Sequence, residues 1–186
     1  MRIILKEIAN IKFCVSPPKP DPTQGKTKWL ACPCFVQDNT LKYEPDERFC
    51  VADKNALIQA DDIVIKRIAP AFVNYIDTIP VNTYAGNNLI VITPSAAVYP
   101  KYLAMILNDR ISVLTEESSV GAVMKSVSRV YLENMEIPLI PFEKQKLVGD
   151  VWGTSIELKK MKTRLIELEC IRESYRLNKY LDTIGG

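Results

Sequence analysis

Residues 137–181 read IPLIPFEKQKLVGDVWGTSIELKKMKTRLIELECIRESYRLNKYL, a stretch with a helical pattern over nearly all of its length. Pro141 suits the first helical position, because a first-turn residue needs no amide donor, and Glu143 follows where a carboxylate complements the helix dipole. About 40 residues of α-helix extend roughly 60 Å, twice the width of a small domain. We therefore expect residues 142–186 to form a long helical arm, and residues 1–141 to form a globular domain.

The arm carries an apolar seam on a four-three spacing, which is typical of a coiled-coil helix. The residues of this seam are Leu147, Val151, Leu158, Met161, Leu165, Leu168 and Tyr175. A second apolar stripe beside it contains Ile166, Cys170, Leu177, Leu181 and Ile184. Because a two-stranded coiled coil needs only one seam, the second stripe indicates contact with a further body.

Two glycines, Gly149 and Gly153, stand four residues apart near the start of the arm. Each costs roughly 1 kcal/mol relative to alanine inside a helix, and together they flatten one face where another backbone can approach. A helix of the globular core with a kink at these glycines is the alternative. The length of the pattern favours the arm.

The residues before the arm predict a mixed α/β (α+β) domain. Buried strands are indicated by runs of β-branched residues at 62–68 and 88–93, and 72–79 would pair with the first of them as a hairpin. Two further strands are expected at 11–15 and at 28–36, the latter interrupted at Pro33. Helical patterns cover 99–108, 111–116 and 130–135, and a strand at 136–140 leads into the arm. Residues 41–50 look irregular, and 82–86 looks like a turn.

The residue types of the chain argue against catalysis. It contains no histidine, which excludes Ser-His-Asp and Cys-His sites. It also lacks a glycine-rich cofactor turn, and carboxylates such as Asp46 and Glu47 are better explained as solvated loop residues than as a nuclease site. The five cysteines lack the spacing of a metal site, so we interpret them as free thiols rather than a zinc site. The sequence therefore predicts no catalytic residue, no metal and no cofactor of its own.

The N-terminal residues do not look like a signal peptide, because Lys6, Glu7 and Lys12 interrupt their apolar character. No apolar run is long enough to span a bilayer. We expect a cytoplasmic protein without a membrane partner.

Four short motifs resemble, in order and spacing, the specificity subunit of type I restriction–modification systems. They are Asp62–Ile65, Pro100–Leu103 with Leu107 and Asn108, Gly121 with Ser126, and Ile137–Gln145. The last is the strongest, because it joins the end of a strand, a helix-starting proline and a glutamine in the first two turns. The resemblance extends over essentially the whole chain.

The resemblance implies a DNA target recognition domain followed by one spacer helix. Such subunits are not enzymes; they bind double-stranded DNA and carry methyltransferase subunits, which themselves bind S-adenosylmethionine, and in some systems a restriction subunit. Family members carry two recognition domains and two helices, whereas this chain has one of each. We therefore expect a half-subunit that forms a homodimer through antiparallel C-terminal helices.

Candidate DNA contacts lie on loops and at a strand end. Side chains of these residue types bind phosphates or base edges. They are Lys26, Lys28, Lys66, Arg67, Asn74, Lys125, Ser126 and Arg129. The net charge of +2 requires any DNA to meet a local patch rather than a globally basic protein.

Two functions remain open from the sequence. One is a non-catalytic DNA-sequence reader that recognises half of a bipartite site and scaffolds a methyltransferase. The alternative is a structural or regulatory coiled-coil protein whose globular domain binds another protein.

Overall fold

The computed structural model describes residues 1–37, 39–42, 45–117 and 125–184. Its contacts divide the chain into two units, Met1–Trp152 and Gly153–Gly186. The first unit is a mixed α/β body, which confirms the predicted fold class. The second unit consists of the later turns of the C-terminal helix.

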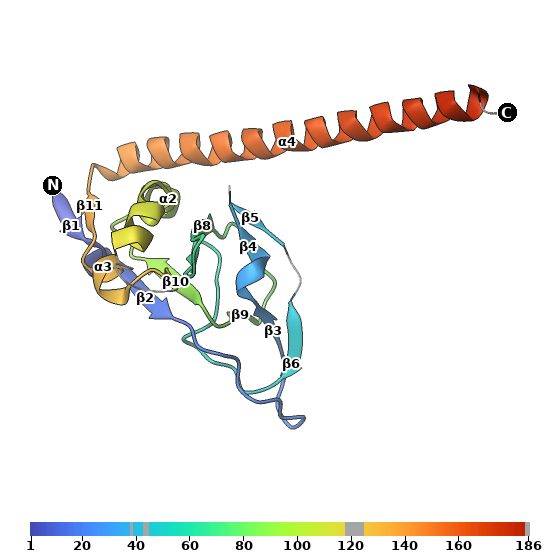
Figure 1. Cartoon of the computed structure of the whole chain (residues 1–186). Coiled ribbons are helices and arrows are strands. Elements are labelled where there is room, and N and C mark those ends of the chain that lie inside the picture. Colours follow the sequence, from blue (N-terminus) through green and yellow to red (C-terminus); the bar gives the residue numbers. More distant parts are fainter. Residues whose placement is uncertain (38, 43–44, 118–124, 185–186) are drawn as a thin grey trace. The chain divides into compact units, whose positions relative to one another are not determined.

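A four-stranded antiparallel sheet lies at the centre of the first unit (Figure 1). Its strands, in spatial order, are β2 (Ala9–Phe13), β10 (Leu89–Pro94), β7 (Ile63–Lys66) and β8 (Phe72–Tyr75). Strands β7 and β8 form the hairpin that the sequence predicted, with Ile65 opposite Val73.

Both faces of this sheet are buried, which explains why its strands are β-branched runs rather than alternating patterns. Ile90 and Ile92 of β10 face one apolar cluster, and Leu89 and Val91 face the other. All four side chains are fully buried.

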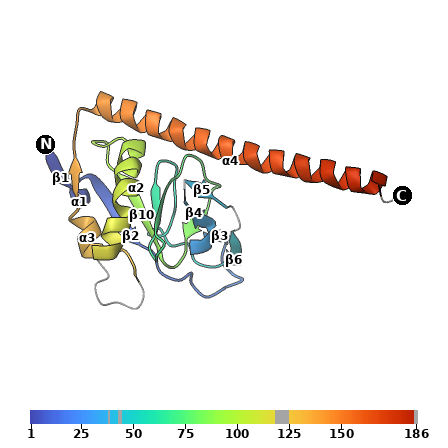
Figure 2. The same cartoon turned by 45° about the horizontal axis from the view of Figure 1, so that its top comes forward.

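Helices contribute to the first apolar cluster, on one side of the sheet (Figures 1 and 2). They are α1 (Leu5–Ile8), α2 (Pro100–Glu117) and α3 (Arg129–Glu133). A two-stranded pair formed by β1 (Arg2–Ile4) and β11 (Glu136–Pro138) joins the N-terminus to the segment that enters the long helix.

Short strands contribute to the second cluster, on the opposite side. A three-stranded sheet consists of β6 (Asp46–Phe49), β3 (Lys26–Leu30) and β9 (Thr83–Ala85). Strand β4 (Phe35–Val36) pairs with β5 (Thr40–Leu41). The predicted interruption at Pro33 is confirmed, because a 3-10 turn at Cys32–Cys34 separates β3 from β4.

Two sequence predictions in this region are wrong. Residues 82–86 were expected to form a turn, but Thr83–Ala85 is strand β9, parallel to β3. Residues 41–50 were expected to be irregular, but Asp46–Phe49 is strand β6, antiparallel to β3. Both strands are short and depend on a partner distant in sequence, so local pattern does not reveal them.

The long C-terminal helix is confirmed as α4, which runs continuously over Phe142–Ile184, through both glycines. Pro141 lies one residue before the helix rather than at its first position. Its carbonyl oxygen accepts hydrogen bonds from the backbone N–H groups of Lys144 and Gln145, at 2.9 and 3.0 Å.

The first turns of α4 are fixed to the first unit by Gln145, which is 1% exposed. Its Oε1 accepts a hydrogen bond from the backbone N–H of Tyr99 at 2.9 Å, and its Nε2 donates to the carbonyl of Ile140 at 2.8 Å. Gln145 therefore accepts a hydrogen bond from the backbone N–H of Tyr99, a group at the start of α2 that has no partner within that helix.

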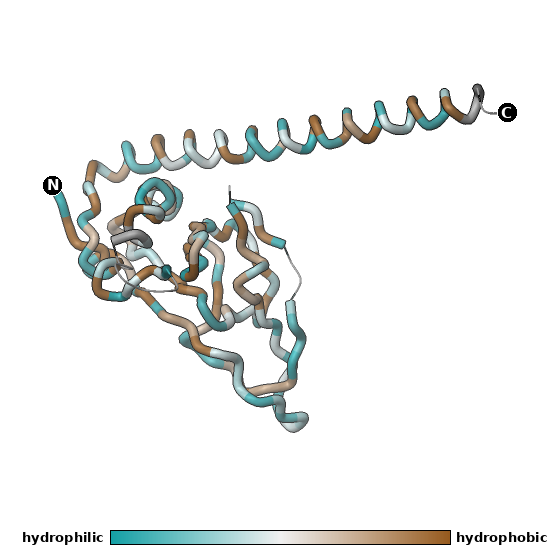
Figure 3. The backbone as a smooth tube through the Cα atoms, viewed as in Figure 1, coloured by the Kyte–Doolittle hydropathy of each residue, from teal (hydrophilic) through white to brown (hydrophobic). Residues whose placement is uncertain are grey.

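Apolar residues recur along the later turns of α4 among hydrophilic ones (Figure 3). Their side chains are exposed in the single chain, with Leu158 at 48%, Met161 at 63% and Leu165 at 57%. Within the described residues, no helix combines the length and apolarity needed to cross a membrane.

Candidate nucleic-acid interface

Two of the predicted DNA-contact segments, far apart in the sequence, lie side by side in the structure. The chain after β7 pairs with residues 125–127: the N–H of Val127 donates to the carbonyl of Arg67, and the N–H of Ala69 donates to the carbonyl of Lys125, each at 3.0 Å. Ile68 and Ser126 form an antiparallel bridge between them. This pairing brings Arg67 close to Lys125, Ser126 and Arg129. Lys66 alternates to the opposite face of β7, where its Nζ lies 5.0 Å from the centroid of the Phe72 ring.

Phe13, at the end of edge strand β2, completes this arrangement. In the sheet register Phe13 is opposite Ile90, which is opposite Ile65, so the three side chains share one face. Arg67 lies two residues beyond Ile65 and therefore continues on that face. Its Cζ atom is 5.7 Å from the centroid of the Phe13 ring, and that of Arg129 is 4.3 Å away.

We call Arg67, Lys125 and Arg129 the basic cluster. Arg129 forms an ion pair of 3.1 Å with Glu133, one turn further along α3. The Nε of Arg67 donates to the carbonyl of Val127 at 3.2 Å. Among the residues that the structure describes, the basic cluster thus presents more positive charge than the carboxylate of Glu133 neutralises.

Two other predicted contacts, Lys26 and Lys28, belong to a different sheet. Both are in β3, and Lys28 is opposite Glu47 of β6. Lys26 forms an ion pair with Glu47 at 2.5 Å and holds the pKa of that carboxyl below its ordinary value. Glu47 therefore balances the charge of Lys26, and Lys28 lies opposite the same carboxylate.

Asn74 lies inside the first unit, at 1% exposure in β8. Within the described residues, neither its amide nitrogen nor its amide oxygen has a hydrogen-bond partner. The structure does not place it with the basic cluster, so its contact with DNA stays a prediction.

The Asp62 motif has a structural role at the start of β7. The Thr93 hydroxyl donates to Oδ1 of Asp62 at 2.7 Å, and the backbone N–H of Gln59 donates to Oδ2 at 2.8 Å. Asp62 is 1% exposed, and burial raises the pKa of its carboxyl. It links the entry of β7 to β10 rather than facing a ligand.

Of the glycine-loop motif, Gly121 lies outside the described residues. Ser126 is half-buried and has a polar or electrostatic interaction of its own in addition to the backbone bridge. Its role in DNA contact stays a prediction.

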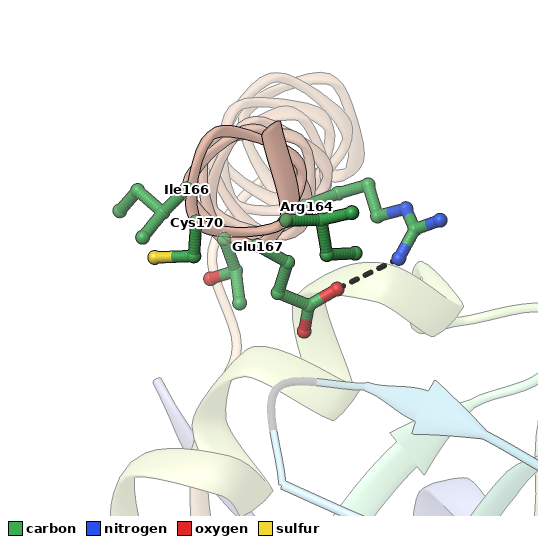
Figure 4. Close-up of a pocket in the computed structure, with 6 residues that line it drawn as sticks. Arg164, Ile166, Glu167 and Cys170 are labelled. Atoms are coloured by element: carbon green, nitrogen blue, oxygen red, sulfur yellow. Dashed lines mark hydrogen bonds and ion pairs between the residues drawn. The ribbon is translucent and has the colours of Figure 1, made fainter. Parts of the chain in front are cut away.

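In the second unit, the predicted partner residues remain available to another chain. Leu168 and Tyr175 are 47% and 68% exposed. A surface pocket, lined on α4 between Thr163 and Ile171, includes Ile166 and Cys170 of the second apolar stripe (Figure 4). An ion pair of 2.9 Å between Arg164 and Glu167 borders it.

The cysteines lie in different surroundings. Burial raises the pKa of the Cys14 thiol to about 11 and also raises that of Cys32, so both are protonated at neutral pH. Over residues 1–37, 39–42, 45–117 and 125–184, no group of three or more His, Cys, Asp or Glu side chains is placed to hold a metal ion.

The sequence did not reveal Phe13 as a neighbour of the two arginines. A phenylalanine at the end of a strand is most simply interpreted as a core residue, and Phe13 does pack at the edge of the first apolar cluster. Only the sheet register, which aligns it with Arg67, reveals its contact with the arginines.

A scan against protein-family models finds no match, and a search of curated proteins finds none. Solved structures do match. One comes from a study of complex assembly and conformational transition of the type I restriction–modification system. It has a TM-score of 0.63 at 18% identity, and the match covers 92% of this chain and 43% of the solved chain. The HsdS subunit from Thermoanaerobacter tengcongensis has a TM-score of 0.59 at 19% identity, covering 86% and 37%. The S subunit from M. genitalium has a TM-score of 0.57 at 17% identity, covering 94% and 44%.

These matches confirm at the level of fold the resemblance that the sequence motifs indicated. The chain has the fold found in type I S subunits, over about nine tenths of its length. It spans less than half of the length of each of these solved chains.

Proposed function

We propose that this chain is a non-catalytic DNA-sequence-recognition subunit of a type I restriction–modification system. The observation that carries the proposal is the basic cluster, assembled from two distant segments on a body with the S-subunit fold. Lysine and arginine side chains gathered in this way are the usual footprint of a DNA backbone contact. Residues 1–141 would form the recognition domain, and residues 142–186 the spacer helix.

The partner of this subunit would be a methyltransferase subunit, which supplies the S-adenosylmethionine site and the chemistry. The absence of histidine from the chain supports a division of labour in which this subunit reads DNA and another acts on it. The second apolar stripe of α4, exposed at Ile166 and Leu177, offers a surface for such a partner.

The chain would form a homodimer through antiparallel α4 helices. The exposed apolar seam of α4 supports this pairing, because apolar surface in water favours association. A two-fold axis would bury Leu158, Met161, Leu165 and Leu168 of both copies, at about 1.5–3 kcal/mol per side chain before the cost of association. The two recognition domains would then read the two halves of an interrupted site.

DNA binding in the presence of the methyltransferase tests the proposal. Binding to duplex DNA should weaken steeply with salt, and Lys125→Ala or Arg129→Ala should weaken it and reduce the slope of log K against log salt by about one. Lys54→Ala removes a charge from an exposed position outside the basic cluster and serves as the matched control. Unchanged affinity and slope in both cluster variants would show that DNA binds elsewhere.

The alternative is a structural or regulatory coiled-coil protein with a protein-binding globular domain. The exposed seam of α4 is compatible with it. Absence of DNA binding even at low salt would favour this alternative. A neighbouring gene encoding an Asn-Pro-Pro-Phe methyltransferase motif would favour the DNA reader.

A further inference from the structure

We propose that Phe13 is a positioning residue, an aromatic platform that holds Arg67 and Arg129 together as a clamp for one DNA backbone phosphate. The inference rests on the proposed function and specifies the chemistry of its contact. It starts from the two guanidinium groups, whose Cζ atoms lie 5.7 and 4.3 Å from the same ring centroid.

Both distances fall within the range in which an arginine is attracted to the face of an aromatic ring. The two cations nevertheless repel each other, and in the described part of the chain the ion pair with Glu133 compensates only Arg129. An anion bound between them would remove that repulsion. A phosphate group is well matched, because its oxygens accept hydrogen bonds from two guanidinium groups at once.

The three elements that meet at Phe13 are each fixed by backbone contacts. Strand β2 is held in register by β10, and the chain at Arg67 is held by its hydrogen bond with Val127. Arg129 begins α3, directly after that pairing. Only the long arginine side chains remain to be ordered, and a ring that both contact restricts their freedom before DNA arrives.

A phosphate clamp and a base-reading contact make different predictions. A phosphate contact carries no sequence information, so its loss weakens binding to the cognate duplex and to an unrelated duplex by the same factor. Loss of a base-edge contact weakens the cognate complex selectively. The aromatic residue itself touches no DNA in this arrangement and acts only through the arginines.

The test compares Phe13→Leu with Phe13→Trp, measuring DNA affinity and its salt dependence for the full chain with its methyltransferase. Leucine keeps the apolar packing and removes the aromatic ring. Tryptophan keeps an aromatic face, which attracts a cation more strongly than that of phenylalanine. We expect Phe13→Leu to weaken binding about five- to thirtyfold on both duplexes, because two arginine side chains must then be ordered when DNA binds, and to lower the salt slope. Phe13→Trp should restore wild-type affinity, which a purely structural role does not predict.

Phe142→Leu is the matched control, because Phe142 is also a partly exposed aromatic residue and its ring contacts Tyr99, whereas both arginines contact Phe13. Phe13→Met gives a second ring-free variant if Phe13→Leu does not fold. The role of Phe13 is refuted if a folded ring-free variant binds DNA with wild-type affinity and salt slope while Arg67→Ala and Arg129→Ala bind more weakly. That result would leave the proposed function standing. Selective weakening on the cognate duplex would replace the phosphate clamp with base reading. Unchanged binding in both arginine variants would overturn the placement of the DNA interface itself.

Discussion

At the scale of single residues, the side chain of Gln145 connects the segments that precede two helices, α2 and α4. Its amide accepts from the N–H of Tyr99, just before α2, and donates to the carbonyl of Ile140, just before α4. Both partners are backbone groups next to helix starts, so loss of the side chain leaves one N–H and one C=O without these hydrogen bonds in a partly buried place.

We predict that Gln145→Ala lowers the free energy of unfolding by about 1–3 kcal/mol, measured by chemical denaturation. Gln59→Ala, at an exposed position, is the control and should stay within about 0.5 kcal/mol of wild type. Equal stabilities for the two variants would mean that solvent replaces the hydrogen bonds of Gln145.

Two carboxyl groups should give opposite pH dependence of stability. Burial raises the pKa of Asp62, so its contribution is complete below the unfolded pKa and is lost as pH rises through the folded pKa. The hydrogen bond from Tyr99 lowers the pKa of Asp150, so its contribution is present above the unfolded pKa and is lost as pH falls through the folded pKa.

Unfolding of wild type, Asp62→Asn and Asp150→Asn across a pH range spanning about 4, the ordinary pKa of aspartate, tests these signs. The stability of wild type relative to Asp62→Asn should fall as pH rises, and that relative to Asp150→Asn should rise. Slopes of the same sign would refute at least one assignment.

At the scale of elements, the contact between α2 and α4 depends on Gly149. A Cβ atom added there would lie 2.7 Å from the backbone nitrogen of Tyr102 and 3.1 Å from the carbonyl carbon of Lys101. Backbone atoms at such distances cannot give way as a flexible side chain does. The expectation that a glycine of this helix admits another backbone is therefore confirmed at Gly149.

Gly149→Ala should destabilise the protein, although alanine is the better helix former by about 1 kcal/mol. The expected net loss is about 1–3 kcal/mol, as for other overpacked sites, measured by thermal unfolding. Gly25→Ala is the matched control, since a Cβ there meets nothing within 4 Å. A stabilised Gly149→Ala protein would mean that the two helices separate without cost.

At the scale of the whole molecule, the exposed apolar seam of α4 indicates that this helix packs against another chain. Leu165 is 57% exposed, and its neighbours on the seam are exposed to a similar degree. A seam of this kind in water favours association, because burial of apolar surface is the main driving force for it.

Light scattering should find a dimer for wild type and a monomer for Leu165→Glu, because a carboxylate at the centre of the seam would be buried without a partner. Lys162→Glu places the same charge on an exposed polar position of α4 and should remain dimeric. A monomeric wild type would refute the homodimer and leave α4 to pair with a different chain.

The sequence by itself determined the elements whose pattern is local. The seam from Leu147 to Tyr175 predicted the long helix, and the β-branched runs 62–68 and 88–93 predicted the central strands, because burial on a helix face or in a sheet leaves a periodic trace. Only the tertiary structure decided the pairing of β9 and β6 with β3, the capping by Gln145 and the meeting of Phe13 with Arg67 and Arg129. Each of these depends on which distant strands become neighbours and in which register. A shift of one residue would turn Phe13 to the other face, and no local pattern encodes that choice.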